Sequence, residues 1–513
     1  MRWIYLLVGA SVYCALAFYY GKGGMIDDAF ITFRYAENLA NGHGLVFNPG
    51  GNPVEGYSNF LWTVLLALCY WFGWQTPAAA FSLGVLSGIG VLLVIYRLLL
   101  LMRASSPQIA AAIGLFATAP SVAIYATSGM ETLFYTLLLT SFLYFFIREG
   151  SAPRLPISGV LAALVCLTRP EGFIVVSVFV LWRIYETFKR TTVSKRNLCI
   201  WLGQIAIITI PFIVWRYSFY GYLLPMTVYA KVTSDQGYRG VRQILGGIRY
   251  FIDFSRVYGG GIGLSFLLWF ASLQIYREWK STWRKSGEGE REGAVVCSSL
   301  FLLWYIFYCI NVGGDWMPQF RFYVPFLPVM YVLLASASFA SEFNKRVYWL
   351  IPAAFIGFNL AQIPLVLNNS IADVDPRIRH NGISFRVDLI EKYTQLGRDY
   401  PGVSLATISC GILPYYSGLE TIDMIGLNDE YIAMRLHEGR TLGGMSDGVY
   451  KKIVDYIFER KPGVIHMDGS LFAHVVYHEI LSDAESFLKD YVLDKQYTRD
   501  GEKFYVRREI LLQ

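Results

Sequence analysis

Long runs of apolar residues, separated by short polar segments, occupy most of the chain up to about residue 367. The first run extends from Trp3 to Tyr20 and is long enough to cross a bilayer, because a spanning helix needs about 20 apolar residues. By the same criterion the chain contains about eleven crossings. The later runs are Ala78–Met102, Ile109–Ile124, Leu133–Ile147, Leu155–Leu167, Phe173–Ile184, Ile200–Trp215, Ile262–Ile275, Ala294–Ile310, Phe322–Phe339 and Val347–Leu367.

Two shorter stretches after the first run do not suit a crossing. Residues Ala29–Asn41 mix apolar and polar side chains at helical spacing, which predicts a helix lying in the membrane interface. The run Phe60–Phe72 is too short for a comfortable crossing, and we interpret it as a second interfacial helix. The first outer loop is therefore predicted to contain two juxtamembrane helices.

The composition supports an integral membrane protein. Hydrophobic residues make up 55% of the chain and charged residues only 16%, whereas soluble domains contain about 25% charged residues. The formal net charge is +6, but Lys and Arg cluster between the apolar runs, which is typical of cytoplasmic loops rather than of a nucleic-acid-binding surface. Arg2 precedes the first run and predicts a cytoplasmic N-terminus, so the first loop and the C-terminal region face the outer side.

After about residue 368 the pattern changes to that of a soluble domain. Val403–Ser409 and Val464–Met467 predict buried strands, while Tyr450–Arg460 and Glu479–Val492 predict helices. About 145 residues are enough for an independent core. We therefore predict a polytopic α-helical domain over residues 1–367 and an extracytoplasmic α/β domain over residues 368–513.

An acidic doublet, Asp27 and Asp28, directly follows the first crossing. Two carboxylates at a membrane edge are costly, so they need a partner or a function. At the start of a helix their charge is favoured by the helix dipole. Arg34 lies seven residues after Asp27, so the two side chains can share one helix face. The alternative interpretation is that the doublet only caps the helix.

Further short motifs lie on the predicted outer side, and their order along the chain is specific. They are I-D-D-A-F-I-T-F-R-Y-A from Ile26, G-H-G-L-V-F-N-P-G from Gly42, V-E-G-Y-S-N-F-L-W-T from Val54, S-G-M-E-T from Ser128, L-T-R-P-E-G from Leu167, G-Y-L-L-P-M-T-V-Y-A-K from Gly221, G-G-D-W-M-P-Q-F-R-F from Gly313 and D-M-I-G-L-N-D from Asp423. Together they resemble the motifs of the GT-C superfamily of polyprenyl-phosphate-sugar-dependent glycosyltransferases. The resemblance is strongest to the mycobacterial enzyme that adds terminal β-(1→2)-arabinofuranose and to the pseudomonad enzyme that arabinosylates type IV pilin.

This resemblance implies a GT-C fold whose first outer loop carries the catalytic acidic motif and two juxtamembrane helices. It implies transfer of D-arabinofuranose from a polyprenyl-phosphate donor to an extracytoplasmic acceptor, either a surface glycan or a pilin. It also implies a multi-pass protein of the bacterial inner membrane, with the active site and the C-terminal domain facing the periplasm.

Transfer from a lipid phosphate needs a carboxylate to deprotonate or orient the acceptor hydroxyl. It also needs cations to stabilise the leaving phosphate. We predict Asp27 as the catalytic carboxylate, with Asp28 supporting it or binding a divalent cation. Mg²⁺ or Mn²⁺ would suit carboxylate and phosphate oxygens, but the sequence requires no cofactor. The predicted donor-phosphate ligands are Arg321, Lys231, Arg34 and Arg169; the alternatives are an interfacial anchor for Arg321, ion pairing for Arg34 and a structural turn at Arg169.

Several polar and aromatic residues of the same motifs are candidates for binding the sugar or the acceptor. Their hydroxyl, amide and carboxyl groups can hydrogen-bond sugar hydroxyls, and Trp316 or Tyr57 can stack on a sugar ring. His43 has the simpler interpretation of a loop residue in a Gly-rich turn. The candidates are Glu55, Tyr57, Ser58, Asn59, Glu131, Asp315, Trp316 and His43.

Two other functions are compatible with the pattern. A GT-C enzyme that uses another polyprenyl sugar, such as mannose or aminoarabinose, on a protein or on lipid A would carry the same groups. A lipid-sugar transporter or flippase with an acidic site is the non-enzymatic alternative. Transporters usually show related halves and broken helices, and the sequence indicates neither.

The sidedness of the first loop is directly testable. We expect a cysteine introduced at His43 to react with a membrane-impermeant maleimide in intact spheroplasts, because residues 26–59 are predicted to lie outside. Wild-type protein, whose seven cysteines remain, provides the background. Labelling only after permeabilisation would place the loop in the cytosol and remove the basis for an outer active site.

Overall fold

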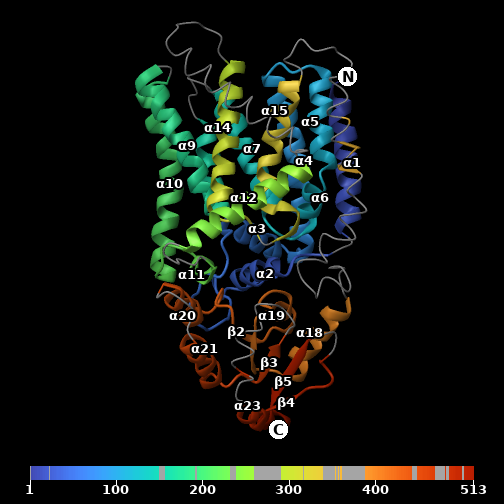
Figure 1. The fold of residues 1–513 in the computed structure, drawn as a ribbon, viewed down its shortest axis with the longest axis vertical. Coiled ribbons are helices and arrows are strands. Elements are labelled where there is room, and N and C mark those ends of the chain that lie inside the picture. Colours follow the sequence, from blue (N-terminus) through green and yellow to red (C-terminus); the bar gives the residue numbers. More distant parts are fainter. Residues whose placement is uncertain are drawn as a thin grey trace. The chain divides into compact units, whose positions relative to one another are not determined.

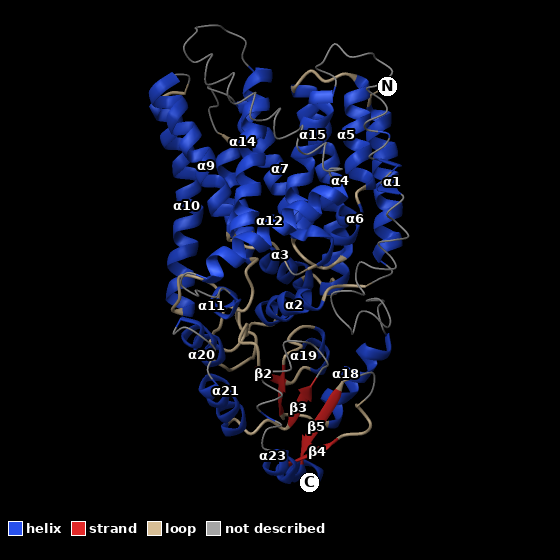
Figure 2. Cartoon of the chain, viewed as in Figure 1, coloured by secondary structure: helices blue, strands red, loops and turns tan. Residues whose placement is uncertain are grey.

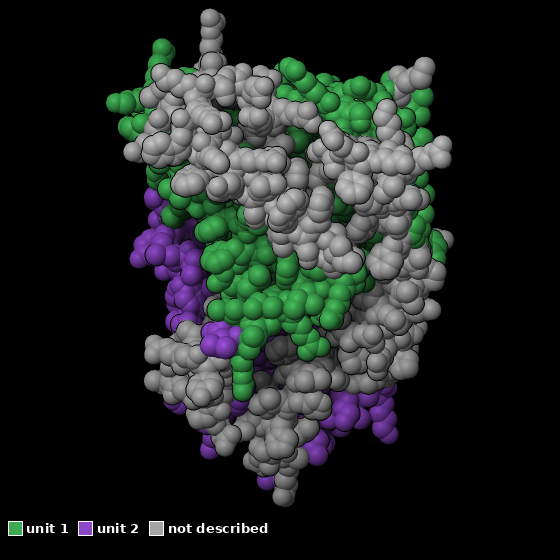
Figure 3. All heavy atoms as spheres, turned by 45° about the horizontal axis from the view of Figure 1, so that its top comes forward, with its two compact units in different colours: residues 1–21, 81–213, 242–370 green, residues 22–80, 214–241, 371–513 purple. Residues whose placement is uncertain are grey.

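The computed structural model describes residues 2–21, 24–149, 156–190, 193–231, 238–258, 290–315, 317–338, 353, 356–357, 359–360, 387–441, 447–467, 480, 484–498 and 502–512. The chain divides into two compact units, which Figure 3 colours separately. Unit 1 comprises Met1–Gly21, Phe81–Ile213 and Arg242–Ser370. Unit 2 comprises Lys22–Ala80, Val214–Val241 and Ile371–Gln513, so it combines the first outer loop with the C-terminal region.

Unit 1 is built from helices, most of which run lengthwise beside one another in Figure 1. Helix α1 packs against α5 and α6, α5 against α15, and α7 against α8. Helices α4 and α10 continue from one unit into the other. The bounds are α1 Trp3–Gly21, α4 Thr76–Leu101, α5 Ser106–Thr118, α6 Pro120–Thr127, α7 Thr132–Glu149, α8 Ile157–Thr168, α9 Glu171–Tyr185, η1 Glu186–Arg190, α10 Lys195–Tyr220, α12 Tyr238–Tyr258, α14 Glu290–Asn311, η2 Pro318–Phe326 and α15 Leu327–Ser338.

Within the described residues, three helices are long and apolar enough to cross a membrane: α1, α4 and α10. The pair α5 and α6 passes the same test as one span, although it is bent by 53°. Several predicted crossings correspond to shorter apolar helices, among them α8 and α14. The predicted runs Ile262–Ile275 and Val347–Leu367 lie wholly or mostly outside the described residues, so the number of eleven crossings stays a prediction.

The predicted crossing Ile109–Ile124 is a broken helix in the structure, although its two parts, α5 and α6, together still pass as one apolar span. Ala119 adopts an extended conformation with φ −69° and ψ 117°, and α6 starts at Pro120. A proline lacks the backbone N–H and disfavours helical geometry in the preceding residue, which explains the break. The expected absence of broken helices therefore no longer argues against a transporter.

Two other predicted boundaries need correction. The segment between Arg216 and Arg256 lies between the predicted crossings Ile200–Trp215 and Ile262–Ile275 and is therefore expected to be an outer loop. It contains instead the end of α10, the short helix α11 (Met226–Lys231) and the amphipathic helix α12. The predicted helix from Phe322 to Phe339 begins with the 3₁₀ segment η2, which contains Pro325. Both errors arise where apolar residues are mixed with arginines or prolines, which weakens the hydrophobic pattern.

The first part of unit 2 confirms the two predicted helices of the first loop, α2 (Asp27–Ala40) and α3 (Phe60–Trp71). They pack against each other, and the Asn59 amide joins them by donating a 3.1 Å hydrogen bond to Thr32 Oγ1. Helix α2 is more enclosed than an interfacial helix would be, since every residue from Ala29 to Ala36 is buried.

The C-terminal part of unit 2 is the predicted α/β domain. Its five strands, red in Figure 2, are β1 Ser404–Thr407, β2 Glu420–Asp423, β3 Val464–Met467, β4 Tyr491–Leu493 and β5 Lys503–Arg507. Their order is β2-β1-β3-β5-β4; β1 is parallel to β2 and β3, and β5 is antiparallel to β3 and β4. The predicted strands β1 and β3 are thus confirmed as neighbours at the centre of the sheet.

Side chains alternate between two cores because successive strand residues point to opposite faces. Leu405 and Val464 pack with helices α18 (Val387–Asp399) and α19 (Ile412–Ser417). Ala406 and Ile465 pack with α20 (Glu430–Thr441), α21 (Asp447–Glu459) and α23 (Ala484–Asp490).

Helix α21 matches the predicted helix at residues 450–460. The predicted helix Glu479–Val492 is wrong at its end, because Tyr491 and Val492 belong to β4. The predicted domain boundary at residues 367/368 lies outside the described part and stays a prediction.

A buried polar cluster ties α18 to the sheet. Glu502 accepts a 2.8 Å hydrogen bond from the Tyr393 hydroxyl and pairs with Lys392 Nζ at 2.7 Å. His466 Nε2 lies 3.8 Å from the same carboxylate, and its Nδ1 is 2.9 Å from Thr407 Oγ1. Burial acts to raise the pKa of Glu502, but His466 and Lys392 outweigh it and hold that pKa below its usual range.

Replacing Glu502 tests this cluster. We expect Glu502→Gln to lower the free energy of unfolding of the domain by about 3 kcal/mol at pH 7, because Lys392 would stay buried without its charged partner. In wild type the stabilisation is present above the unfolded-state pKa of about 4.3 and is lost as the pH falls, because the folded-state pKa is depressed. Calorimetry of the purified protein across pH 3 to 7 measures both effects. Glu509→Gln, at an exposed ion pair with Arg507, is the matched control and should change little.

Candidate active site

The acidic doublet occupies the first turn of α2. The N-cap is Ile26, whose side chain makes no capping bond, and the half-buried Asp27 and Asp28 follow it. The Asp27 carboxylate accepts hydrogen bonds from two backbone N–H groups far along the chain: Ile412 N to Oδ1 at 2.9 Å and Gly411 N to Oδ2 at 3.2 Å. Asp27 is therefore not simply a helix cap, because it holds the C-terminal domain.

Gly411 is required for this approach. A Cβ atom at residue 411 would lie 1.9 Å from the backbone oxygen of Asp27 and 2.6 Å from its Cγ. Neither atom can move away without shifting the first turn of α2, because one belongs to the backbone and the other to the carboxyl group itself. No pattern around Gly411 indicated this contact, so sequence reasoning missed the residue.

Arg34 extends the same contact instead of standing free for a ligand. Its guanidinium is buried and donates to Pro414 O at 2.5 Å, Leu419 O at 2.8 Å and Phe47 O at 2.8 Å. A fourth bond, at 3.1 Å, goes to Asn48 Oδ1. Four of the five N–H donors of a guanidinium are used in this way. The structure thus gives Arg34 a structural role, which weakens the prediction that it binds the donor.

Asn48, in the motif that starts at Gly42, forms hydrogen bonds with the edge strand of the sheet. Its amide nitrogen donates to Thr421 O at 2.8 Å, and its oxygen accepts from Thr421 N at 2.9 Å. This pair of bonds mimics a neighbouring strand beside the edge strand β2. His43, in the same motif, is exposed between Gly42 (φ 83°) and Gly44 (φ 85°), which fits a loop residue.

Glu55 forms a buried ion pair with Arg216, whose Nε lies 2.7 Å from Oε2 and 2.9 Å from Oε1. Burial raises the pKa of Glu55 to about 7, although the charge of Arg216 acts in the opposite direction. Arg216 NH1 also donates to Leu223 O at 2.9 Å. The predicted role of Glu55 in binding sugar stays a prediction, and its partner Arg216 was not foreseen.

The other predicted residues of this motif differ in exposure. Tyr57 is buried, and its hydroxyl lies 3.1 Å from that of Tyr220, which in turn donates to Leu45 O at 2.9 Å. Asn59 is buried between α2 and α3, whereas Ser58 is exposed. Among these three side chains, Ser58 alone is exposed.

The motif that begins at Asp423 packs against the motif that contains Gly56. Asp423 accepts bonds from Ile425 N at 2.9 Å and from Asn428 N at 2.8 Å, which shapes the loop after β2. A Cβ atom at Gly56 would lie 1.8 Å from Asn428 Oδ1. The structure therefore brings together two motifs that lie far apart in the sequence.

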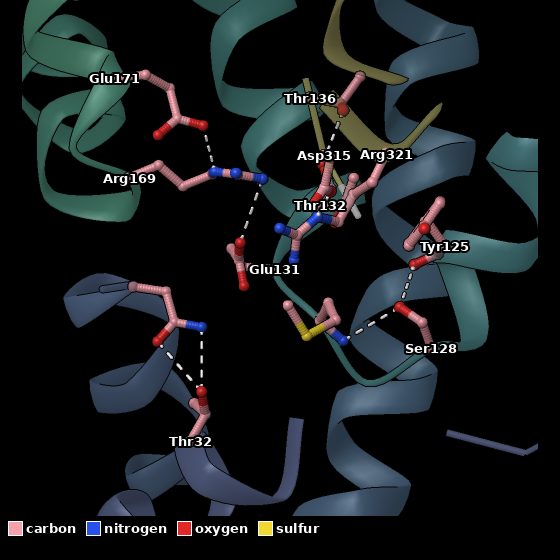
Figure 4. Close-up of polar contacts among 12 residues, drawn as sticks. Thr32, Tyr125, Ser128, Glu131, Thr132, Thr136, Arg169, Glu171, Asp315 and Arg321 are labelled. Atoms are coloured by element: carbon pink, nitrogen blue, oxygen red, sulfur yellow. Dashed lines mark hydrogen bonds and ion pairs between the residues drawn. The ribbon is translucent and has the colours of Figure 1, made fainter. Parts of the chain in front are cut away.

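Unit 1 contains its own cluster of buried charges, shown in Figure 4. Arg169 lies between two carboxylates: Nε is 2.5 Å from Glu171 Oε1, and NH1 is 3.4 Å from Glu131 Oε1. Its guanidinium carbon is also 5.5 Å from the ring centroids of both Tyr135 and Phe322. The predicted motif residues Glu131 and Arg169 are thus brought together.

Arg321 and Asp315 form a second pair beside the first. Arg321 Nε lies 2.6 Å from Asp315 Oδ2, and the Arg321 guanidinium carbon is 5.2 Å from the Phe322 ring that Arg169 also contacts. Figure 4 shows the two guanidinium groups close to each other. Their repulsion is offset by the three carboxylates, which leaves a cluster with both signs of charge.

The backbone before Arg321 is held in an unusual conformation. Gln319 (φ 58°) and Phe320 (φ 55°) are both left-handed, which costs about 1 kcal/mol or more per residue. Phe320 contacts the rings of Tyr250 and Tyr258 on α12, and Gln319 Oε1 accepts a 3.3 Å bond from the Tyr258 hydroxyl. Helix α12 therefore holds the turn that directs Arg321, and such strain is frequent at functional sites.

The structure describes no side-chain contacts for two of the predicted ligands. Trp316 lies outside the described residues, and Lys231 is described only as the last residue of α11. Among the described residues, no group of three or more His, Cys, Asp or Glu side chains could hold a metal ion. A divalent cation at Asp27 and Asp28 would need substrate or water oxygens to complete its shell, as Mg²⁺ commonly does.

The fold as a whole is shared with solved membrane glycosyltransferase structures of the GT-C class. The structure of ArnT from Cupriavidus metallidurans bound to undecaprenyl phosphate matches with a TM-score of 0.55 at 12% identity, covering 99% of this chain and 98% of that one. The apo form of the same protein matches with a TM-score of 0.59, covering 98% and 97%. The Archaeoglobus fulgidus oligosaccharyltransferase matches with a TM-score of 0.55 at 12% identity, covering 96% and 73%. The predicted GT-C fold is therefore confirmed.

At the level of sequence the relationships are sparser. Residues 383–507 match a family described as a domain of unknown function (DUF8728). This match covers most of the C-terminal α/β domain, including Gly411 and Ile412. No curated protein matches the chain.

Arg169 is the residue whose loss should most disturb the cluster in unit 1. We expect Arg169→Ala to destabilise the detergent-solubilised protein by about 3 to 5 kcal/mol, because two buried carboxylates would lose their cation. Arg148→Ala, at the exposed end of α7, is the control. Thermal unfolding measures the difference, and equal unfolding temperatures for the two variants would show that the pairing contributes nothing.

Proposed function

We propose that the chain is a membrane glycosyltransferase that takes a sugar from a polyprenyl-phosphate donor and delivers it to an extracytoplasmic acceptor. We further propose that the sugar is D-arabinofuranose and that the acceptor is a surface glycan or a pilin. The protein would be a multi-pass protein of the bacterial inner membrane, with its active site and C-terminal domain in the periplasm.

The observation that carries this proposal is the fixed carboxylate of Asp27 in a chain with the GT-C fold. The fold extends over nearly the full length of ArnT, a protein whose solved structure contains undecaprenyl phosphate. The first turn of α2 supplies the paired acidic groups that such a transfer needs, and two N–H bonds orient one of them.

In the proposed reaction, the oxygen of the acceptor hydroxyl forms a bond to the anomeric carbon of the donor sugar. Asp27 accepts the hydroxyl proton, while Asp28 supports it or binds a divalent cation with the phosphate oxygens. The bond between the anomeric carbon and the phosphate oxygen breaks, and its electron pair leaves with the lipid phosphate. The chain needs no oxidant or reductant for this step.

The leaving phosphate requires positive charge, and the proposed ligands Arg321 and Arg169 would supply it by exchanging a carboxylate partner for the phosphate. A guanidinium binds phosphate oxygens with two parallel N–H groups. Arg321 is the better candidate, since its known partner is one carboxylate, whereas Arg169 is held between two. Lys231 remains a proposed ligand on α11.

The choice of arabinofuranose rests on the ordered motifs that resemble the arabinofuranosyltransferases. Mannose or aminoarabinose as the donor sugar is the alternative within the same reaction. A flippase is the alternative outside it, and the broken pair α5 and α6 is a feature that transporters share.

The test is a transfer assay with purified protein and polyprenyl phosphates that carry arabinofuranose, mannose or aminoarabinose. We expect transfer from the arabinofuranose donor and a decrease in kcat of about 100-fold or more for Asp27→Asn, because an amide cannot accept the proton. Asp455→Asn, on the exposed side of α21, is the matched control and should keep full activity.

Full activity of Asp27→Asn would disprove the catalytic assignment. Movement of the lipid-linked sugar across a vesicle membrane without any transfer would support the flippase instead. Mass spectrometry of surface glycans and pilins from a deletion strain identifies the acceptor.

A further inference from the structure

The surroundings of Asp27 show a feature that the transfer reaction alone does not explain. The two groups that hold the proposed catalytic carboxylate are not on its own loop. They are the backbone N–H groups of Gly411 and Ile412, which follow strand β1 of the C-terminal domain. A soluble domain that served only to bind an acceptor would not need to contact the reacting group.

We propose that the segment from Gly411 to Leu419 of the C-terminal domain is a positioning element for catalysis, which orients the Asp27 carboxylate. The inference deepens the proposed function and rests on it. Gly411 and Ile412 are positioning residues, since they act on the reaction through Asp27 and supply only their backbone N–H groups.

The physical basis is the preference of an N–H donor for a charged acceptor. A hydrogen bond from a backbone N–H to a carboxylate is charge-assisted, so it is shorter and stronger than a neutral one and fixes the position of the oxygen that accepts it. Each oxygen of Asp27 accepts one bond, at 2.9 and 3.2 Å, so two of about four lone-pair sites are occupied. With one bond to each oxygen, the carboxylate plane cannot rotate freely.

Two further residues on the same side of α2 bind the segment from Gly411 to Leu419 and fix its position along the helix. Arg34 donates to Pro414 O and Leu419 O, which lie within and just after α19. Glu37 accepts a bond from the Tyr415 hydroxyl and a 2.7 Å bond from Thr76 Oγ1. With Asp27, these contacts fall at positions i, i+7 and i+10 of α2, within about one quarter of its circumference.

The arrangement requires glycine at position 411. Its Cα approaches the backbone of Asp27 so closely that a Cβ atom would meet the Asp27 oxygen at 1.9 Å. Gly411 also has φ −97° and ψ −97°, outside the common regions for residues with a side chain. The segment can therefore reach the carboxylate only with glycine at this position.

The decisive experiment compares two substitutions of Ile412 in the full-length protein. Ile412→Pro removes the N–H that donates to Asp27 Oδ1, and proline is favoured at the first position of a helix, which Ile412 occupies in α19. Ile412→Ala keeps the N–H and shortens the same side chain, so it is the matched control.

For Ile412→Pro we expect kcat to fall about tenfold to a hundredfold relative to Ile412→Ala, the usual value of a hydrogen bond to a charged group. The KM for the donor should stay unchanged. A lowered kcat with an unchanged KM shows that the reacting group is misplaced while the donor still binds. A merely structural role of the segment would change both parameters or the unfolding temperature.

A second variant keeps the inference testable if Ile412→Pro does not fold. Gly411→Ala displaces the segment from Asp27 and should lower kcat at least as much, while Gly402→Asn changes an exposed glycine of the same domain whose added Cβ meets nothing within 4 Å. Thermal unfolding of all four variants separates loss of positioning from loss of fold.

The outcomes distinguish the inference from the function on which it rests. Transfer by wild type with equal kcat for Ile412→Pro and Ile412→Ala would overturn the positioning role and leave the proposed function intact. Absence of transfer by wild type with every donor would overturn the proposed function, and the positioning role with it.

Discussion

The carboxylate of Asp27 is the group on which the arrangement of unit 2 depends. An ionised carboxyl group that leaves water needs hydrogen-bond donors in its place, and the chain provides two from residues almost 400 positions away. Backbone N–H groups are well suited to this, since they are fixed by the fold and have no side-chain freedom to lose. The first loop and the C-terminal domain are therefore parts of one structural unit.

The same physical requirement explains the other buried charges. Glu55 is paired with Arg216, Arg169 with Glu131 and Glu171, and Arg321 with Asp315. Breaking a buried pair is costly because the remaining charge stays desolvated. Pairs of this kind add little net stability, so their presence in motifs argues for a role in specificity or chemistry. The aromatic contacts of Phe322 with both arginines keep the two guanidinium groups close despite their repulsion.

For catalysis, the arrangement suggests a division of tasks between residues that react and residues that hold them. Asp27 and Asp28 carry the chemistry in the proposed reaction, while Arg34 binds backbone carbonyls and acts as scaffold. The strained turn at Gln319 and Phe320 has the same supporting role for Arg321. Preorganisation of this kind lowers the barrier because the groups need not be reoriented during the reaction.

The sequence by itself determined the helices of the first loop, the strands β1 and β3, and the position of the acidic doublet at the start of α2. These features follow from local patterns, namely apolar periodicity, β-rich runs and charge at a helix start, which need no knowledge of distant residues. The motifs also identified Glu131, Arg169, Asp315 and Arg321 as candidates.

Only the tertiary structure decided which of these residues are partners. Local patterns carry no information about pairs such as Asp27 with Ile412 or Glu55 with Arg216, because these contacts join segments separated by more than 150 residues. The break before Pro120 was missed because the run is apolar on both sides of it. Helix α12 was missed because it is amphipathic and contains no continuous apolar run of the kind that marks a crossing. The need for Gly411 was invisible for the same reason, since it arises from the approach of a distant backbone atom.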